Sequence, residues 1–154
     1  MAGEANFTRD EWQTMRRAVS VVGVVVSLAE GGGDDMREEL FAITQHLRGA
    51  RMTHANQLVR ELAGMPFQSG LRPGMSPVDY ERGALEAVRA ATAIVEARAS
   101  TDLEAFRGFV LELAQVAAHA HREGGFLGMG GVQVTAAEEA AIERVKRAAG
   151  IVTT

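Results

Sequence analysis

Residues 18–29 read Ala-Val-Ser-Val-Val-Gly-Val-Val-Val-Ser-Leu-Ala, and this stretch decides the fold. The residues that interrupt or flank the apolar ones are Arg16, Ser20, Gly23, Ser27 and Glu30. They follow one another at steps of four, three, four and three. This spacing places these residues on one narrow stripe of an α-helix and leaves apolar groups around the rest of its circumference. Such a helix needs neighbours on most sides, so we expect it to lie buried at the centre of the protein.

The rest of the chain supplies amphipathic helices that can surround it. We expect six helices, over about residues 9–30, 35–48, 53–63, 77–99, 101–123 and 135–149. Apolar residues recur at steps of three and four in the fourth helix (Leu85, Val88, Thr92, Val95, Ala99) and in the fifth (Leu103, Phe106, Val110, Leu113, Ala117). A second row, including Phe109 and Val116, widens the apolar face of the fifth helix. These two helices are expected to pair as an antiparallel hairpin.

Capping signals mark several helix starts. Thr8 and Glu11, Thr101 and Glu104, and Thr135 and Glu138 have the spacing of capping boxes. Ser76 followed by Pro77 is typical of an N-cap and the first helical position. The segment 64–76 collects three glycines and two prolines and is expected to cross the surface as the longest irregular connection.

A strand is the alternative for the valine run, because valine has high β-propensity. A strand needs a partner, and the only other candidate is the short segment 132–134. The sequence therefore predicts an all-α fold: one helical domain, residues 1–154, built as a bundle of about six helices around a buried first helix.

Composition limits the classes of function. The 154 residues are 47% hydrophobic and 23% charged, with a net charge of −4 and no cysteine. The acidic balance argues against nucleic-acid binding, and the missing cysteine removes disulfides, thiolate metal sites and a cysteine nucleophile. The apolar run is shorter than the ~20 residues of a spanning helix, and no secretory signal is recognised at the start. We expect a cytoplasmic protein without a transmembrane span.

One layout occurs twice: an apolar helix, glycines, then a helix with an acidic first turn. Its copies are residues 27–39 and 120–139, with Asp35 corresponding to Thr135. This predicts an internal duplication of residues 9–48 and 101–149, with independent use of the same capping chemistry as the alternative explanation.

The same layout, in residues 29–39 and 134–142, resembles the tellurite-resistance TerB-like proteins, which are all-helical bacterial domains. Residues 123–135 also resemble the C-terminal stretch of uncharacterised bacterial helical proteins. The resemblance covers about a third of the chain. It implies a bacterial, stress-associated or accessory role and no particular reaction.

The densest acidic group is a candidate cation site. Its members are Asp34, Asp35, Glu38 and Glu39, in a glycine-flanked loop and the first helical turn after it. Flexible loops rich in carboxylates suit hard divalent cations, but the EF-hand pattern is absent. Acidic residues at a helix start also complement the helix dipole, which explains the group without a metal. The four histidines lack the helical spacings of metal ligands, so no cofactor is expected beyond this candidate cation.

The loop at residues 124–131 holds Phe126, Leu127 and Met129 between glycines. These side chains could enter a partner groove or a membrane surface peripherally, or fold back onto the preceding helix end. At the other end of the chain, Arg16 and Arg17 precede the valine run and could contact an anion or simply be solvated.

Two hypotheses for the function follow. The first is a non-enzymatic accessory protein that acts by self-association or through a protein partner, with Phe126, Leu127, Met129, Phe109 and Val116 as interaction residues. The second is a metal- or small-ligand-binding stress protein of the TerB-like kind. No catalytic residue is assigned, because no motif for a nucleophile or a general base occurs.

Overall fold

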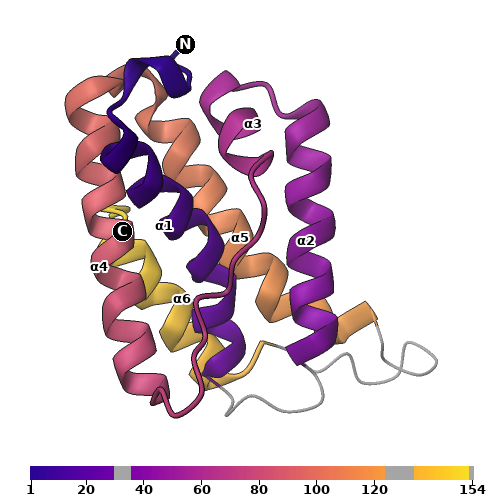
Figure 1. The fold of residues 1–154 in the computed structure, drawn as a ribbon. Helices are drawn as coiled ribbons and strands as arrows, with labels where there is room; N and C mark the ends of the chain where they lie inside the picture. Colours follow the sequence, from indigo (N-terminus) through magenta and orange to yellow (C-terminus); the bar gives the residue numbers. More distant parts are fainter. Residues whose placement is uncertain (30–35, 124–133, 153–154) are drawn as a thin grey trace.

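The helix that carries the valine run, α1 (Arg9–Leu28), lies within the bundle and packs against each of the other five α-helices (Figure 1). The computed structural model describes residues 1–29, 36–123 and 134–152, with only the backbone of residues 121–123. The remaining α-helices in this part of the chain are α2 (Met36–Thr53), α3 (Gln57–Ala63), α4 (Pro77–Arg98), α5 (Leu103–Glu123) and α6 (Ala136–Ala148). Two short 3₁₀ helices, η1 (Glu4–Asn6) and η2 (Ser100–Asp102), complete the described elements, which include no strand. The predicted all-α bundle is confirmed.

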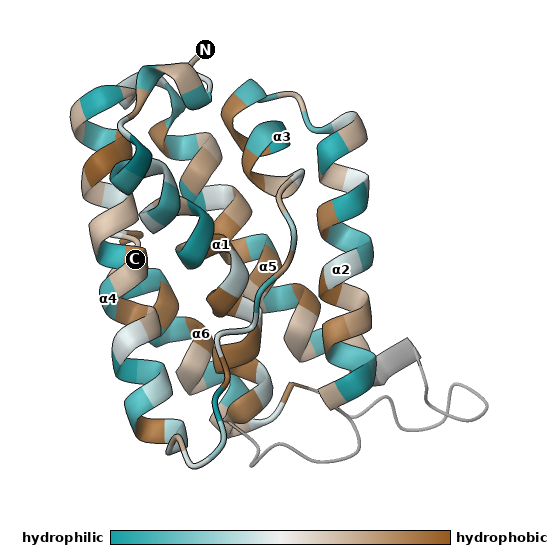
Figure 2. Ribbon diagram, viewed as in Figure 1, coloured by the Kyte–Doolittle hydropathy of each residue, from teal (hydrophilic) through white to brown (hydrophobic). Residues whose placement is uncertain are grey.

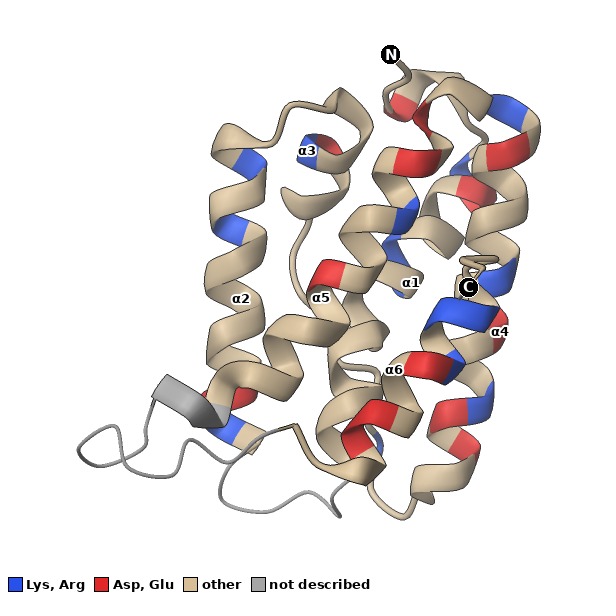
Figure 3. Cartoon of the chain, turned by 180° about the vertical axis from the view of Figure 1, so that it is seen from behind, with Lys and Arg blue, Asp and Glu red and all other residues tan. Residues whose placement is uncertain are grey.

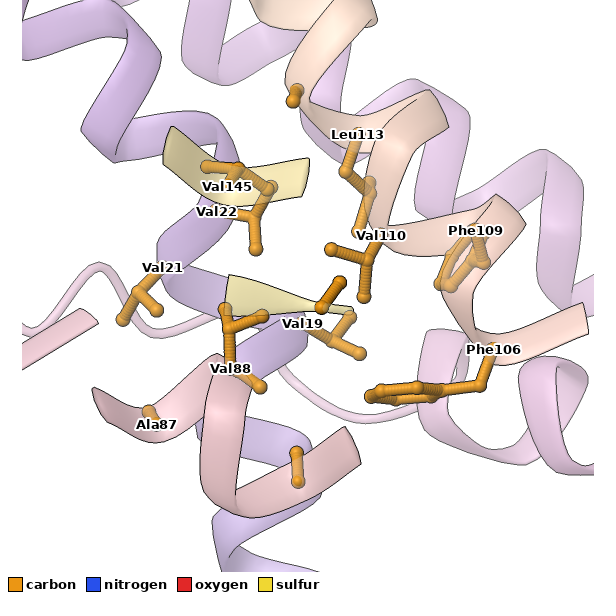
Figure 4. Packing of buried hydrophobic residues seen from close by; sticks show 14 of the residues in the cluster. Val19, Val21, Val22, Ala87, Val88, Phe106, Phe109, Val110, Leu113 and Val145 are labelled. Carbon is orange, nitrogen blue, oxygen red and sulfur yellow. The ribbon is translucent and has the colours of Figure 1, made fainter. Parts of the chain in front are cut away.

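Burial of α1 explains why so many valines form a helix. Every residue from Ala18 to Ser27 is buried. Figure 4 shows Val19 between Val88 of α4 and the α5 side chains of Phe106 and Val110. The apolar environment on all sides outweighs the modest helix propensity of valine, because burying each such side chain contributes about 1.5–3 kcal/mol.

The predicted seams of α4 and α5 both face the core. All ten seam residues, from Leu85 to Ala99 and from Leu103 to Ala117, are buried. In Figure 1, α4 runs upward and α5 returns downward, with contacts between them and from both to α1. Charged residues are frequent along the outward faces of α4 and α6 (Figure 3), where Arg144 pairs with Glu81.

Two of the three predicted capping boxes form. Thr8 and Glu11 exchange hydrogen bonds of 2.8 and 3.2 Å at the start of α1, and Thr135 and Glu138 do the same at the start of α6. Ser76 caps α4 by accepting from the backbone N–H of Asp79 at 3.1 Å.

The box predicted at Thr101 does not form. The chain makes η2 before α5 begins at Leu103, and the carboxylate of Asp102 is directed elsewhere. It accepts hydrogen bonds from the Ala2 N–H at 2.8 Å and the Asn56 side chain at 2.7 Å. These long-range partners are supplied only by the folded chain.

The second helix is longer than predicted. It continues past Gly49 to Thr53, and α3 starts at Gln57 with Asn56 as its cap. A helical glycine costs about 1 kcal/mol relative to alanine, and burial of Leu47 and Ala50 on either side of it offsets this cost. None of the described helices is long and apolar enough to cross a membrane.

Candidate functional site

The connection between α3 and α4, residues 64–76, lies across α1 and forms the outer wall of a pocket (Figure 1). Hydrophobic and hydrophilic residues both occur along it (Figure 2). The Tyr80 hydroxyl of α4 donates a hydrogen bond to the Ser69 carbonyl. Gly70 and Gly74 have φ values of 70° and 81°, a region that favours glycine, and so permit the turns in this segment. The hydrogen bond from Tyr80 to Ser69 holds the connection against α4.

The pocket between α1, this connection and the first half of α4 has a volume of about 460 Å³. That size is typical of sites for small organic ligands. Val21 of α1 and Ala84 of α4 supply buried apolar lining, and Leu71 and Met75 of the connection add further apolar surface. The pocket can therefore accept apolar as well as polar atoms.

The polar stripe of α1 divides between two tasks. Its first half, Arg16 and Ser20, lines the pocket together with Arg17. Its second half serves packing, because Gly23 leaves room for Ile43 of α2 and the Ser27 hydroxyl donates to the Gly23 carbonyl at 3.1 Å. The stripe recognised in the sequence is thus a pocket wall at one end and a helix contact at the other.

Positive charge dominates the pocket. Arg16, Arg17 and Arg72 line it, and its one acidic residue, Asp79, already pairs with Arg82 at 3.3 Å. In the described part of the chain, no hydrogen bond or ion pair engages any of the three lining guanidinium groups.

The most informative atom is Nε of Arg16. It is buried and has no hydrogen-bond partner among the described residues. A buried donor without an acceptor costs about 1–3 kcal/mol, and more when the group is charged. A ligand oxyanion in the pocket could supply an acceptor to this guanidinium.

Arg17 and Tyr80 interact electrostatically across the pocket. Burial raises the pKa of Tyr80, and the positive charge of Arg17 opposes this rise in part. The phenol therefore stays protonated at neutral pH and can donate to Ser69. A β-carbon on Gly83 would lie 3.2 Å from Nη2 of Arg17. The absence of a side chain at Gly83 therefore allows this guanidinium group to lie close to the backbone of α4.

The acidic candidate site is only partly within the described residues. Asp34 and Asp35 lie outside them, Glu38 is exposed and Glu39 is buried. Among the residues that the structure describes, no group of three or more histidine, cysteine, aspartate or glutamate side chains could hold a metal ion. A cation site that uses Asp34 and Asp35 stays a prediction.

The proposed interaction residues fall into two groups. Phe126, Leu127 and Met129 lie outside the described residues. Phe109 is completely buried and Val116 is partly buried against the core. This corrects the expectation of an accessible second row on α5, because α2 and the segment after it cover the Phe109 ring.

The cover over Phe109 consists largely of two histidines. The His46 ring stacks on Phe109 at 6.1 Å between centroids, and His54 approaches it edge-on at 5.9 Å. His46 also pairs with Glu112 at 3.2 Å. These two histidines therefore serve packing and surface pairing.

Several pocket residues carried no recognisable signal in the sequence. Arg72, Gln68 and Tyr80 come from segments whose relation to α1 depends on the path of the connection. The possible anion contact at Arg16 and Arg17 is the one sequence prediction that coincides with the pocket.

No protein-family model matches the chain, and no curated protein and no solved structure shows significant similarity to it. The resemblance to the TerB-like proteins therefore stays a prediction.

Proposed function

We propose that this protein is a non-enzymatic helical binding protein that holds a small anionic molecule in the pocket between α1, the connection 64–76 and α4. The observation that carries the proposal is that Arg16, Arg17 and Arg72 line one cavity and that no hydrogen bond or ion pair among the described residues engages their guanidinium groups. Guanidinium groups bind carboxylate and phosphate oxygens through charge-assisted, often bidentate hydrogen bonds.

The chemistry of the lining supports binding rather than catalysis. Hydroxyl groups come from Thr14, Ser20 and Tyr80, but the described residues that line the pocket include no histidine or glutamate to act as a base. Asp79 pairs with Arg82, and the Tyr80 hydroxyl donates to Ser69. Nothing in this set forms a nucleophile and general base of the usual kind.

Isothermal titration calorimetry with inorganic phosphate, 1-naphthyl phosphate and 1-naphthoate tests this proposal. We expect at least one of these anions to bind, and Arg16→Met to weaken that binding by about tenfold, the effect of losing one charge-assisted hydrogen bond. Arg48→Met, at an exposed position of α2, removes the same charge away from the pocket and should leave the affinity unchanged. Absence of binding, or equal effects of the two substitutions, would exclude the pocket as an anion site.

Self-association is the second candidate function, and the outer face of α2 favours it. Phe41 and Met52 are 66% and 73% exposed, and their spacing of eleven places them on one face of the helix. Gln45 and Arg48, also exposed, lie between them, so the apolar surface is interrupted. Native mass spectrometry of the wild type and Phe41→Glu tests it: a multimer that the substitution dissociates supports association through α2, whereas a wild-type monomer rules it out.

A further inference from the structure

We infer that the ligand is an organic anion with a compact apolar body, held with its charged group at Arg16 and Arg17 and its body against Val21, Leu71 and Met75. This inference rests on the proposed anion-binding function and adds the chemical class of the ligand. The mixture of charged and apolar residues that line the pocket, and its volume, support this class of ligand.

Along α1 the lining changes character over about two turns. Gln13, Thr14, Arg16 and Arg17 are polar, whereas the lining farther along α1 combines the small hydroxyl side chain of Ser20 with Val21, which is apolar and buried. At a rise of about 1.5 Å per residue, Val21 lies about 6 Å along the axis beyond Arg17. One end of the α1 wall therefore suits a charged group and the other suits an apolar one.

The other two walls combine polar and apolar residues, because Arg72 lies between Leu71 and Met75 on the connection and Asp79 precedes Tyr80 on α4. The connection descends beside α1 toward the start of α4 (Figure 1), and Leu71 and Met75 follow Pro66 and Gln68 along it. Helix α4 runs opposite to α1, and the contact between Arg17 and Gly83 places the later α4 residues beside the arginines. Tyr80, a residue that is 6% exposed, lies about one turn before Gly83 on α4.

The volume of the pocket also fits a ligand that has both a charged group and an apolar body. A bare inorganic anion would leave most of the 460 Å³ unfilled, including the space that Leu71 and Met75 line. An organic anion could satisfy the arginines and also remove apolar surface from water, which contributes about 25 cal/mol per Å² of buried area. Arg72 on the connection can bind either a carboxylate or a phosphate, so both head groups fit the charge of the site.

Calorimetric titrations with four probes test the inference: inorganic phosphate, 1-naphthyl phosphate, 1-naphthoate and uncharged 1-naphthol. We expect one naphthyl anion to bind at least about tenfold more tightly than both inorganic phosphate and 1-naphthol, a ratio that equals about 1.4 kcal/mol. Whether the tighter probe is the phosphate or the carboxylate identifies the head group.

Substitutions at the two ends separate the contributions. Leu71→Gln with Met75→Gln should reduce the advantage of the naphthyl anion by about tenfold and leave inorganic phosphate binding unchanged, whereas Arg16→Met should weaken both anions. Leu71→Gln alone, at a side chain that is 39% exposed, provides a second variant if the double variant unfolds.

The outcomes distinguish this inference from the function on which it rests. If inorganic phosphate binds as tightly as the naphthyl anions and the apolar substitutions have no effect, anion binding stands and the organic class is wrong. If 1-naphthol binds as tightly as the anions, or if no probe binds, both the organic anion and the anion site are excluded.

Discussion

The side chain of Ile43 occupies the space where a β-carbon of Gly23 would stand. Its Cγ1 atom lies 2.8 Å from that position, and its Cδ1 atom lies nearer still. Ile43 is completely buried, so this contact sets how closely α2 approaches the central helix. The close contact with Ile43 thus explains why the valine run is interrupted by a glycine at position 23.

We predict opposite effects for alanine at two helical glycines. Gly23→Ala should destabilise the protein by about 1–3 kcal/mol, because overpacking against Ile43 outweighs the gain in helix propensity. Gly49→Ala, with no atom within 4 Å of the new β-carbon, should stabilise it by up to about 1 kcal/mol. Urea unfolding of both variants measures the two free energies. Ile43→Val, which removes Cδ1, should recover part of the stability lost in the Gly23→Ala background. If both alanine substitutions stabilise the protein, or both destabilise it, the explanation from packing is wrong.

Asp102 is predicted to hold three segments together. Asp102 is 2% exposed, and its carboxylate accepts hydrogen bonds from the backbone N–H of Ala2 and from the side chain of Asn56, which caps α3. Asp102→Ala should lower the free energy of unfolding by about 1.5–3 kcal/mol, because two partly buried donors lose a charged acceptor. Asp10→Ala, at an exposed position in the first turn of α1, serves as the control in the same thermal or urea unfolding experiment. A loss at Asp102 no larger than at Asp10 would show that these hydrogen bonds contribute little.

The capping box at the start of α1 predicts a dependence of stability on pH. A hydrogen bond from the Thr8 backbone lowers the pKa of Glu11 below its ordinary value of 4.5, with a further contribution from Arg98. Because the folded-state pKa is depressed, the stabilisation is present above pH 4.5 and is lost as the pH falls through the lowered pKa.

Glu11→Gln should therefore be less stable than the wild type at neutral pH, with the difference shrinking as the pH falls below 4.5. Urea unfolding at several pH values measures this difference. Glu96→Gln, at an exposed position of α4, should show no comparable convergence. A pH-independent difference for Glu11→Gln would mean that its charge does not contribute.

Gly83 is predicted to position Arg17 for the ligand. Gly83→Ala adds a β-carbon 3.2 Å from Nη2 of Arg17, whereas Gly108→Ala on α5 meets no atom within 4 Å. Both changes raise helix propensity, so both proteins should remain folded. Only Gly83→Ala should weaken binding of 1-naphthyl phosphate in calorimetry, by several-fold. Equal affinities in the two variants would show that Arg17 does not depend on the space above Gly83.

The ends of the helices show how far local sequence reaches. Thr8 with Glu11, Ser76 with Pro77, and Thr135 with Glu138 were predicted correctly, because each cap is formed by residues within three positions of one another. Thr101 and Glu104 have the same spacing but make no box, because Asp102 binds partners from residues 2 and 56. The second helix passes Gly49 for a similar reason, since its course depends on what Leu47 and Ala50 pack against.

The sequence by itself determined that the chain is an all-α bundle around residues 18–29, because helical periodicity and capping are set by neighbours along the chain. Only the tertiary structure decided that Arg16 and Arg17 meet Arg72 and Tyr80 around one cavity, and that Phe109 is enclosed by His46 and His54. Both arrangements depend on the path of the connection 64–76 and on how α2 packs against α1. Contacts between distant segments follow from packing of the whole chain, and no local pattern encodes them.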